Sequence, residues 1–204
     1  MIAIVDYGMG NAGSIQNMLL RLGQRSVITN DHDAIRAADK LILPGVGTFD
    51  QAVQNLDERG LRDVLHERVL EERIPILGIC LGMQLFTQRS EEGGAAEGLG
   101  WFKADTRRFV FPAERPLRLP HMGWNTLHVE RPHPVLDNLA DEARFYFVHT
   151  YHVVCHRSED ILARARYGIP FTAMIARDNI VGAQFHPEKS HRFGLALMSR
   201  FAAL

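Results

Sequence analysis

Two separate segments of the chain carry side chains that together could perform nucleophilic catalysis. Cys80 lies in Gly78-Ile79-Cys80-Leu81-Gly82, a G-x-C-x-G motif at a predicted strand-to-helix junction, which is the setting of a nucleophile elbow. The helix expected to begin at Leu81 would direct free N–H groups and a positive dipole end at the sulfur, and both favour the reactive thiolate. A buried cysteine in a glycine-flanked turn fits this motif equally well, so the motif alone does not decide.

The second segment is residues 182–189, GAQFHPEK. His186 and Glu188 follow a strongly apolar predicted strand, and side chains two residues apart in an extended chain point the same way. Pro187 fixes its own φ and biases His186 towards extended geometry. A carboxylate that orients an imidazole beside a cysteine produces an activated nucleophile. The alternative is an exposed turn with incidental charge, but the apolar strand before His186 favours a catalytic role.

A third segment could stabilise negative charge on a substrate oxygen. Pro44-Gly45-Val46-Gly47 ends another predicted parallel strand, and ligands of open α/β sheets bind at the carboxyl ends of strands. Backbone N–H groups of Val46 or Gly47 could complete an oxyanion hole with the N–H of Leu81. Losing one such donor typically costs about 10²–10³ in rate. Taken alone, this segment favours a simple turn.

The elements that must position these residues alternate in the first half of the chain. Strand patterns and helical spacing follow one another, which predicts a mainly parallel sheet covered on both faces. The expected strands are residues 2–6, 26–29, 40–43 and 74–79, and the expected helices are 12–22, a short one after Asn30, 48–56, 61–72 and one beginning at 81–87.

The second half has a different pattern. Aromatic and β-branched residues at 144–155 predict a strand or hairpin. Two more strands are expected around a turn at Asp178-Asn179, followed by a terminal helix at 191–203. A glycine-rich loop at 91–100 and short strand-like pieces at 106–129 complete the chain. The prediction is an α/β fold in one domain, residues 1–204, with a mainly parallel central sheet flanked by helices and a smaller antiparallel addition.

Composition excludes several classes of protein. The 204 residues carry a formal net charge of -1, which argues against a dedicated binder of nucleic acid or anionic membrane. No apolar run is long enough to span a bilayer, and the apolar start at residues 1–5 runs into Asp6 without a basic leader, so we expect a strand there and no signal peptide. Cys80 and Cys155 cannot form a disulfide framework, which favours a reduced, cytoplasmic protein.

Five further motifs occur in a fixed order along the chain after the opening MIAIVDYGMGN. They are PGVG (44–47), GICLGMQ (78–84), PHMGWN (120–125), YFVHTY (146–151) and GAQFHPEKS (182–190). Together these motifs resemble the glutaminase subunits of imidazole glycerol phosphate synthase, from histidine biosynthesis, which are class I glutamine amidotransferases. The resemblance covers nearly the whole chain; its cysteine elbow and HPE motif are shared across class I, whereas PHMGWN and DYGMGN are typical of the histidine-pathway subunit.

This resemblance implies a flavodoxin-like three-layer fold and a set of residue roles. Cys80 would attack the side-chain amide carbon of L-glutamine, His186 would move the proton to leaving ammonia, Glu188 would orient His186, and water would then hydrolyse the thioester. The resemblance implies oxyanion donors at Val46 or Gly47 and Leu81. It also implies substrate contacts at Gln84 and near His149, Thr150 and Tyr151.

The resemblance further implies a partner and no metal or organic cofactor. Ammonia would pass to a (β/α)8 cyclase subunit in a heterodimer, with Trp124 and Asn125 at the interface. We expect low glutaminase activity without the cyclase, with a mobile loop at residues 44–47 as the physical candidate for the control. Thr150 and His152 stand where serine and an aromatic residue are more usual, and Gly13 is also unexpected.

Four alternatives remain. The first is a dinucleotide-dependent oxidoreductase, because Gly8-x-Gly10-x-x-Gly13 follows a strand and Asp31 lies near the offset of a ribose-binding acid; however, Asp31 has an ordinary use as a helix cap.

The second alternative is a metal site, since His149, His152, Cys155 and His156 are close in sequence. In a strand, His149 and Cys155 would face away from His152 and His156, which disfavours convergence. The third is a non-catalytic relative, which the intact Cys80, His186 and Glu188 argue against. The fourth is a peptidase with a similar elbow, against which Gln84 and the HPE pair favour the amidotransferase.

Overall fold

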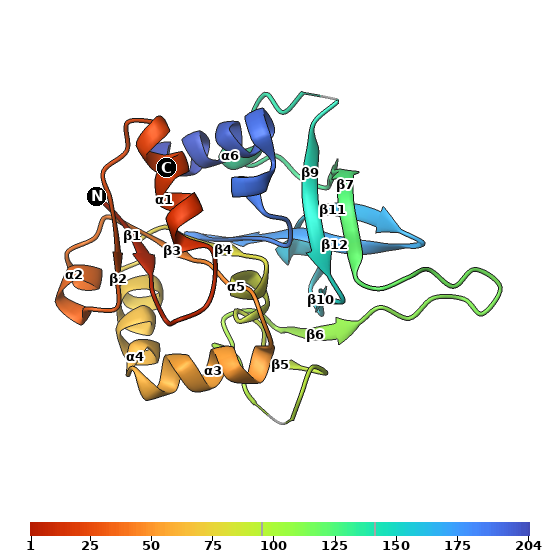
Figure 1. Ribbon diagram of the computed structural model, residues 1–204, viewed down its shortest axis with the longest axis horizontal. Helices are drawn as coiled ribbons and strands as arrows, with labels where there is room; N and C mark the ends of the chain where they lie inside the picture. Colours follow the sequence, from red (N-terminus) through yellow and green to blue (C-terminus); the bar gives the residue numbers. More distant parts are fainter. Residues whose placement is uncertain (95, 141) are drawn as a thin grey trace.

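The protein is built around one large sheet with helices on both of its faces. The computed structural model describes residues 1–94, 96–140 and 142–204. Over these residues, eleven strands form the large sheet, and a two-stranded sheet lies beside it (Figure 1). The strands are β1 (Ile2–Val5), β2 (Ser26–Thr29), β3 (Lys40–Leu43), β4 (Ile76–Ile79), β5 (Arg89–Ser90), β6 (Ala104–Arg108), β7 (His121–Thr126), β8 (His128–Val129), β9 (Arg144–His149), β10 (Tyr151–Cys155), β11 (Ile161–Tyr167), β12 (Ile169–Arg177) and β13 (Ile180–Ala183). The helices are α1 (Ala12–Arg21), α2 (His32–Arg36), α3 (Phe49–Glu58), α4 (Leu61–His66), α5 (Leu81–Gln84) and α6 (His191–Ala203), with shorter helical turns η1 (Glu67–Glu71), η2 (Pro134–Leu136), η3 (Ser158–Asp160) and η4 (Pro187–Lys189).

Five parallel strands form the half of the sheet that holds the catalytic candidates. Their order is β2-β1-β3-β4-β13, the doubly wound order of flavodoxin-like folds. Leu43 of β3 pairs with Gly78 of β4, and Ile79 of β4 pairs with Ala183 of β13. This register brings the carboxyl ends of β3, β4 and β13 to one edge, so the three segments singled out in the sequence lie together.

The other half of the large sheet is mostly antiparallel, with one parallel pair, β5 and β6. β12 pairs antiparallel with β13, β10 and β11, and β10 pairs antiparallel with β6. The predicted α/β fold with a mainly parallel sheet and an antiparallel addition is therefore confirmed. The sequence analysis did not predict β11, because Arg164 and Arg166 interrupt its apolar pattern. It expected a strand only at residues 173–176, whereas β12 begins at Ile169.

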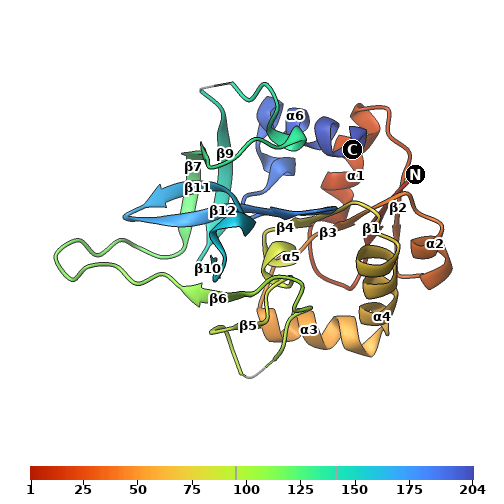
Figure 2. The same ribbon diagram turned by 180° about the vertical axis from the view of Figure 1, so that it is seen from behind.

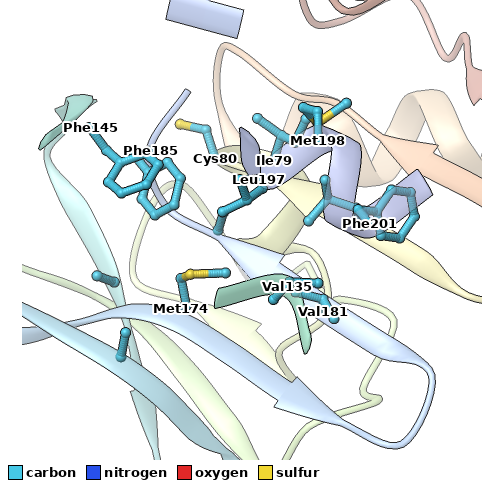
Figure 3. Close-up of a cluster of buried hydrophobic side chains, with 14 of the residues drawn as sticks. Ile79, Cys80, Val135, Phe145, Met174, Val181, Phe185, Leu197, Met198 and Phe201 are labelled. Carbon is cyan, nitrogen blue, oxygen red and sulfur yellow. The ribbon is translucent and has the colours of Figure 1, made fainter. Parts of the chain in front are cut away.

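Two hydrophobic cores lie on the two faces of the parallel strands. Along β1, Ile2 and Ile4 enter one core and Ala3 and Val5 enter the other, as the alternation of a strand requires. Helices α1 and α6 cover the first face, and α2, α3 and α4 cover the second (Figures 1 and 2). Cys80 borders the first core, close to Ile79 and the α6 side chains (Figure 3).

Helix α5 is shorter than predicted. It ends at Gln84 instead of continuing to Thr87, because the Thr87 hydroxyl donates to the Gln84 carbonyl at 2.7 Å and the chain then turns with bonds between residues three apart. One turn of helix carries only a small dipole, so it favours the thiolate of Cys80 less than the sequence analysis assumed.

The predicted strand at 144–155 is two strands in two different sheets. β9 forms a two-stranded sheet with β7, whereas β10 pairs with β6 and β12 in the large sheet. The chain changes sheets at Thr150, whose carbonyl accepts from the N–H of Phe109 at 3.2 Å. Part of the predicted loop at 91–100, residue 95, lies outside the described residues. Among the residues described, no helix has the length and apolar character needed to cross a membrane.

Candidate active site

Cys80 occupies a sharp turn between β4 and α5. Its φ of +54° lies in the left-handed region, which is unusual for a residue other than glycine, and its N–H donates to the carbonyl of Ala183 at 2.7 Å. The flanking glycine is required, since a Cβ on Gly82 would lie 1.9 Å from the carbonyl oxygen of Leu43. The backbone at Cys80 thus has the geometry of a nucleophile elbow, with the side chain 7% exposed.

His186 and Glu188 form a buried pair beside Cys80. The Nδ1 of His186 lies 2.8 Å from Oε1 of Glu188, and both side chains are 2% exposed. Two further bonds fix the backbone: the N–H of His186 donates to Tyr146 at 2.9 Å, and the Ser190 hydroxyl donates to the His186 carbonyl at 2.7 Å. The imidazole is therefore held with one nitrogen on the carboxylate.

The surroundings of His186 favour its charged form. Burial alone lowers the pKa of His186, but the interactions of the imidazole with Cys80 and Glu188 outweigh burial and raise the pKa to about 10. Its buried Nε2 has no hydrogen-bond partner of good geometry within the described part of the chain. This nitrogen is thus available to exchange a proton with Cys80.

The loop after β3 packs directly against the elbow. A Cβ on Gly45 would lie 2.6 Å from the Tyr7 hydroxyl and 2.7 Å from the Cβ of Leu81. The Tyr7 hydroxyl donates to the carbonyl of Pro44 at 2.6 Å, and burial raises the pKa of Tyr7 far above its usual range. Leu81 is the first residue of α5, so its N–H has no acceptor within the helix. The loop and the elbow therefore lie side by side.

A cavity of about 280 Å³ opens in front of these groups. It contacts the predicted nucleophile and base, the three predicted oxyanion residues and the four predicted substrate residues. Glu188 lies behind His186 and does not line the cavity. The lining residues are Val46, Gly47, Cys80, Leu81, Gln84, Glu92, Pro120, Val148, His149, Thr150, Tyr151 and His186.

Two polar residues of this site were missed in the sequence analysis. Glu92 lines the cavity and accepts from the N–H of Phe49 at 3.0 Å, and burial raises the pKa of Glu92. Gln184 is fully buried beside Cys80. The two carboxyls that begin the glycine-rich loop could have indicated Glu92 as a polar site residue. The spacing of two residues between Gln184 and His186 could have indicated that Gln184 faces the same site.

His149 belongs to a chain of neutral side chains. Its Nδ1 lies 2.8 Å from the Tyr151 carbonyl, which can only accept, so Nδ1 carries the hydrogen and Nε2 accepts from Nδ1 of His121 at 3.0 Å. Nε2 of His121 then accepts from the Asn125 amide at 3.4 Å. Burial lowers the pKa of His149 to about 3 and that of His121 to about 4, which keeps both rings neutral at pH 7.

The histidines and cysteine proposed for a metal site do not converge. His149 ends β9, whereas His152 lies on β10 and stacks on Phe109 with ring centroids 4.5 Å apart. His156 lies 3.2 Å from Asp105. Within the described ranges, no group of three or more His, Cys, Asp or Glu side chains is arranged to hold a metal ion.

The two predicted interface residues point to opposite sides of β7. Trp124 is 45% exposed and stacks on His191 with centroids 5.3 Å apart. The Asn125 amide instead faces inward, where it donates to the carbonyl of Arg166 at 2.8 Å and contacts His121. Trp124 is therefore the more exposed of the two, whereas Asn125 is partly buried and lines a separate surface pocket.

The glycine motif of the dinucleotide alternative serves packing within the protein. A Cβ on Gly10 would lie 2.9 Å from Pro44, so this glycine lets the first loop approach the loop after β3. A Cβ on Gly8 would lie 2.9 Å from the Arg59 guanidinium, whereas Gly13 has no atom near its Cβ position. Asp31 caps α2 by accepting from the N–H of Ala34 at 2.8 Å. These contacts favour the cap over a ribose-binding role.

Comparison with known proteins shows similarity over nearly the whole chain. The glutamine amidotransferase class-I family matches residues 3–202. Over 98% of both chains, the sequence is 50% identical to imidazole glycerol phosphate synthase subunit HisH 2 of Methanococcus maripaludis; it is 48% identical to the subunit HisH 2 of Pseudomonas aeruginosa over 100% of both. A solved glutamine amidotransferase aligns with a TM-score of 0.69 at 23% identity, covering 97% of this chain and 99% of the other. PurLQS from Thermotoga maritima aligns with a TM-score of 0.69 at 15% identity, covering 99% and 96%. These two structures agree in fold.

Proposed function

This chain belongs to the class I glutamine amidotransferases, and we propose on that basis that it is the glutaminase subunit of imidazole glycerol phosphate synthase in histidine biosynthesis. It hydrolyses L-glutamine to glutamate and ammonia. The ammonia passes to a (β/α)8 cyclase subunit, which uses it to make imidazole glycerol phosphate and AICAR. The observation that carries the proposal is the buried His186–Glu188 pair, 2.8 Å apart, beside the elbow cysteine at the cavity.

In the proposed mechanism, Cys80 loses its proton to Nε2 of His186 and attacks the amide carbon of glutamine. The raised pKa of His186 makes its imidazole a strong acceptor for this proton. The carbonyl oxygen becomes an oxyanion that accepts from the N–H groups of Leu81 and of Val46 or Gly47.

His186 then gives its proton to the departing nitrogen, and ammonia leaves with formation of the thioester. Water, activated by His186, attacks the thioester carbon and releases glutamate. Glu188 holds the imidazole in the tautomer that this sequence needs and stabilises its charged form. We propose no metal or organic cofactor for these steps.

Residues at the cavity wall are proposed to hold the amino-acid part of glutamine. Gln84, His149, Thr150 and Tyr151 all line the cavity within reach of Cys80. Trp124 and Asn125, neighbours on β7, are proposed at the cyclase interface. The proposed site of action is the cytoplasm, in keeping with the free thiols of Cys80 and Cys155.

Labelling with a glutamine-like electrophile tests the nucleophile. The adduct is expected on the Cys80 peptide, and Cys80→Ala should remove both the adduct and the glutaminase activity. Cys155→Ala is the matched control, because Cys155 does not line the cavity and burial raises its pKa to about 12. An adduct on Cys155, or none on Cys80, would contradict the mechanism.

A second experiment tests the partner. Glutamine labelled with ¹⁵N at the amide is supplied to the chain with and without the cyclase and its substrate. We expect a low glutaminase rate for the chain alone, a large rise with the loaded cyclase, and the label in imidazole glycerol phosphate. Equal rates in the two conditions would count against control by the cyclase.

A further inference from the structure

A fully buried amide lies against the sulfur of Cys80. Nε2 of Gln184 is 3.6 Å from Sγ of Cys80, a normal length for a hydrogen bond to the larger sulfur atom. Gln184 extends the line of β13 and reaches Cys80 from the side of that strand. Phe185, the next residue, points the opposite way and packs on Phe145 with centroids 4.2 Å apart (Figure 3). Gln184 and His186 both interact with Cys80.

The orientation of this amide is determined by its neighbours. Gln84 lies 3.1 Å from the carbonyl of Tyr151, and because a carbonyl can only accept, the atom of Gln84 that faces it is the donor Nε2. The same Nε2 lies 3.0 Å from Gln184, so the atom of Gln184 that faces it is the acceptor Oε1. Nε2 of Gln184 is left facing Cys80. A hydrogen is therefore directed at the sulfur.

A donor in this position distinguishes the two forms of the cysteine. A neutral thiol is a weak acceptor, whereas a thiolate accepts a charge-assisted bond that is roughly twice as strong as a neutral one. The bond is buried, which strengthens it further. The single turn of α5 supplies little dipole, so this amide provides stabilisation that the elbow lacks.

We infer that Gln184 is a further catalytic residue, which donates a hydrogen bond to the Cys80 thiolate and holds the sulfur between itself and His186. This inference rests on the proposed function. When the proton moves from Sγ to Nε2 of His186, the negative charge that remains on Sγ meets the Gln184 N–H. Gln84 serves as the positioning residue that keeps Gln184 in this orientation.

Other titratable groups near the sulfur also affect how the reactivity of Cys80 depends on pH. His186 faces Cys80 and carries Glu188 behind it, and Tyr7 lies close enough for the charge on Cys80 to raise its pKa. The cavity wall adds Glu92 and the neutral His149. A change at Gln184 leaves these groups in place, so a shift between variants reports on the amide.

The test is the pH profile of Cys80 alkylation by iodoacetamide in the full chain, with Cys155→Ala in every protein so that only one thiol reacts. Gln184→Glu keeps the acceptor for Gln84 and replaces the donor by an oxygen. Gln184→Met removes both polar atoms at similar length. Thr106→Val is the control, because Thr106 is equally buried and hydrogen-bonded but does not line the cavity.

The midpoint of the alkylation profile is expected to rise by about one to two pH units in Gln184→Met, since a hydrogen bond to a charged group is worth about that shift. Gln184→Glu should shift it at least as far, because a second negative charge opposes the thiolate. Thr106→Val should not move the midpoint.

If Gln184→Met does not fold, the midpoint of Gln184→Glu tests the inference. Unchanged midpoints in the folded variants, or an equal shift in Thr106→Val, overturn the inference alone, whereas an unreactive Cys80 with native Gln184 overturns the proposed function as well.

Discussion

Replacing Gly45 by alanine should separate catalysis from the reactivity of the cysteine. The new Cβ would lie 2.6 Å from the Tyr7 hydroxyl, 2.7 Å from the Cβ of Leu81 and 2.8 Å from the N of Gly82. Ordinary contact begins at 3.4 Å, so each distance is short by 0.6–0.8 Å (3.4 minus 2.8 and 3.4 minus 2.6). Tyr7 is held by its bond to Pro44, and the other two atoms belong to the elbow.

The loop at residues 44–47 is therefore the part that must move, and it would carry its N–H groups away from the oxyanion position. We expect kcat to fall about 10²-fold or more, as when one oxyanion donor is lost. Overpacking of this kind should also lower the free energy of unfolding by about 1–3 kcal/mol. Alkylation of Cys80 by iodoacetamide needs no oxyanion hole, so its rate should change little.

The assay is steady-state glutaminase kinetics with the cyclase present, together with urea unfolding and the alkylation rate. Gly13→Ala is the matched control, because no atom lies within 4 Å of the Cβ position and Gly13 is the second residue of α1. It should leave kcat unchanged and stabilise the protein by about 0.4–1 kcal/mol, because alanine restricts the unfolded chain more than glycine does. A folded Gly45→Ala with kcat within threefold of the native chain would refute the reasoning, as would an equal loss in Gly13→Ala.

Three further predictions follow from contacts at and around the site. Glu188→Gln removes the charge that orients His186 and stabilises its protonated form, so kcat should fall about 10²–10⁴-fold while the protein stays folded. A loss of kcat under fivefold would contradict the proposed role of the His186–Glu188 pair. His152→Phe should be more stable than the native protein, by a margin that grows as the pH falls. Burial lowers the pKa of His152 in the folded protein to about 4, so between pH 6.5 and 4 only the unfolded chain binds the proton. The free energy of unfolding of the native protein therefore falls by about 1.4 kcal/mol per pH unit in this range, whereas that of the variant lacks this loss. Parallel urea titrations of both proteins from pH 7 to 5 measure this, and equal slopes would contradict it. Asp31→Ala should cost about 1 kcal/mol through the lost cap of α2 and leave glutaminase activity intact, whereas a thermal shift with NAD that this variant abolishes would support a dinucleotide site.

The sequence determined the elements that depend on neighbouring residues. Alternating apolar residues predicted β1, β3 and β4, and helical spacing predicted α1 and α6, because both periodicities are local properties of the chain. The glycines around Cys80 predicted a sharp turn for the same reason. The spacing of His186, Pro187 and Glu188 also predicted a contact that local geometry produces.

The tertiary structure decided which distant groups meet. The sequence signals of Glu92 and Gln184, a carboxyl beside glycines and a position two residues before His186, do not show that either residue reaches Cys80. Glu92 is placed at the site by its bond to the N–H of Phe49, and Gln184 is placed there by the pairing of β13 with β4. The split of residues 144–155 between two sheets likewise depends on partners far along the chain. Periodicity tells which face of an element is buried but not which element covers it. The sequence therefore predicted the proposed nucleophile and base, and the fold determined the groups that surround them.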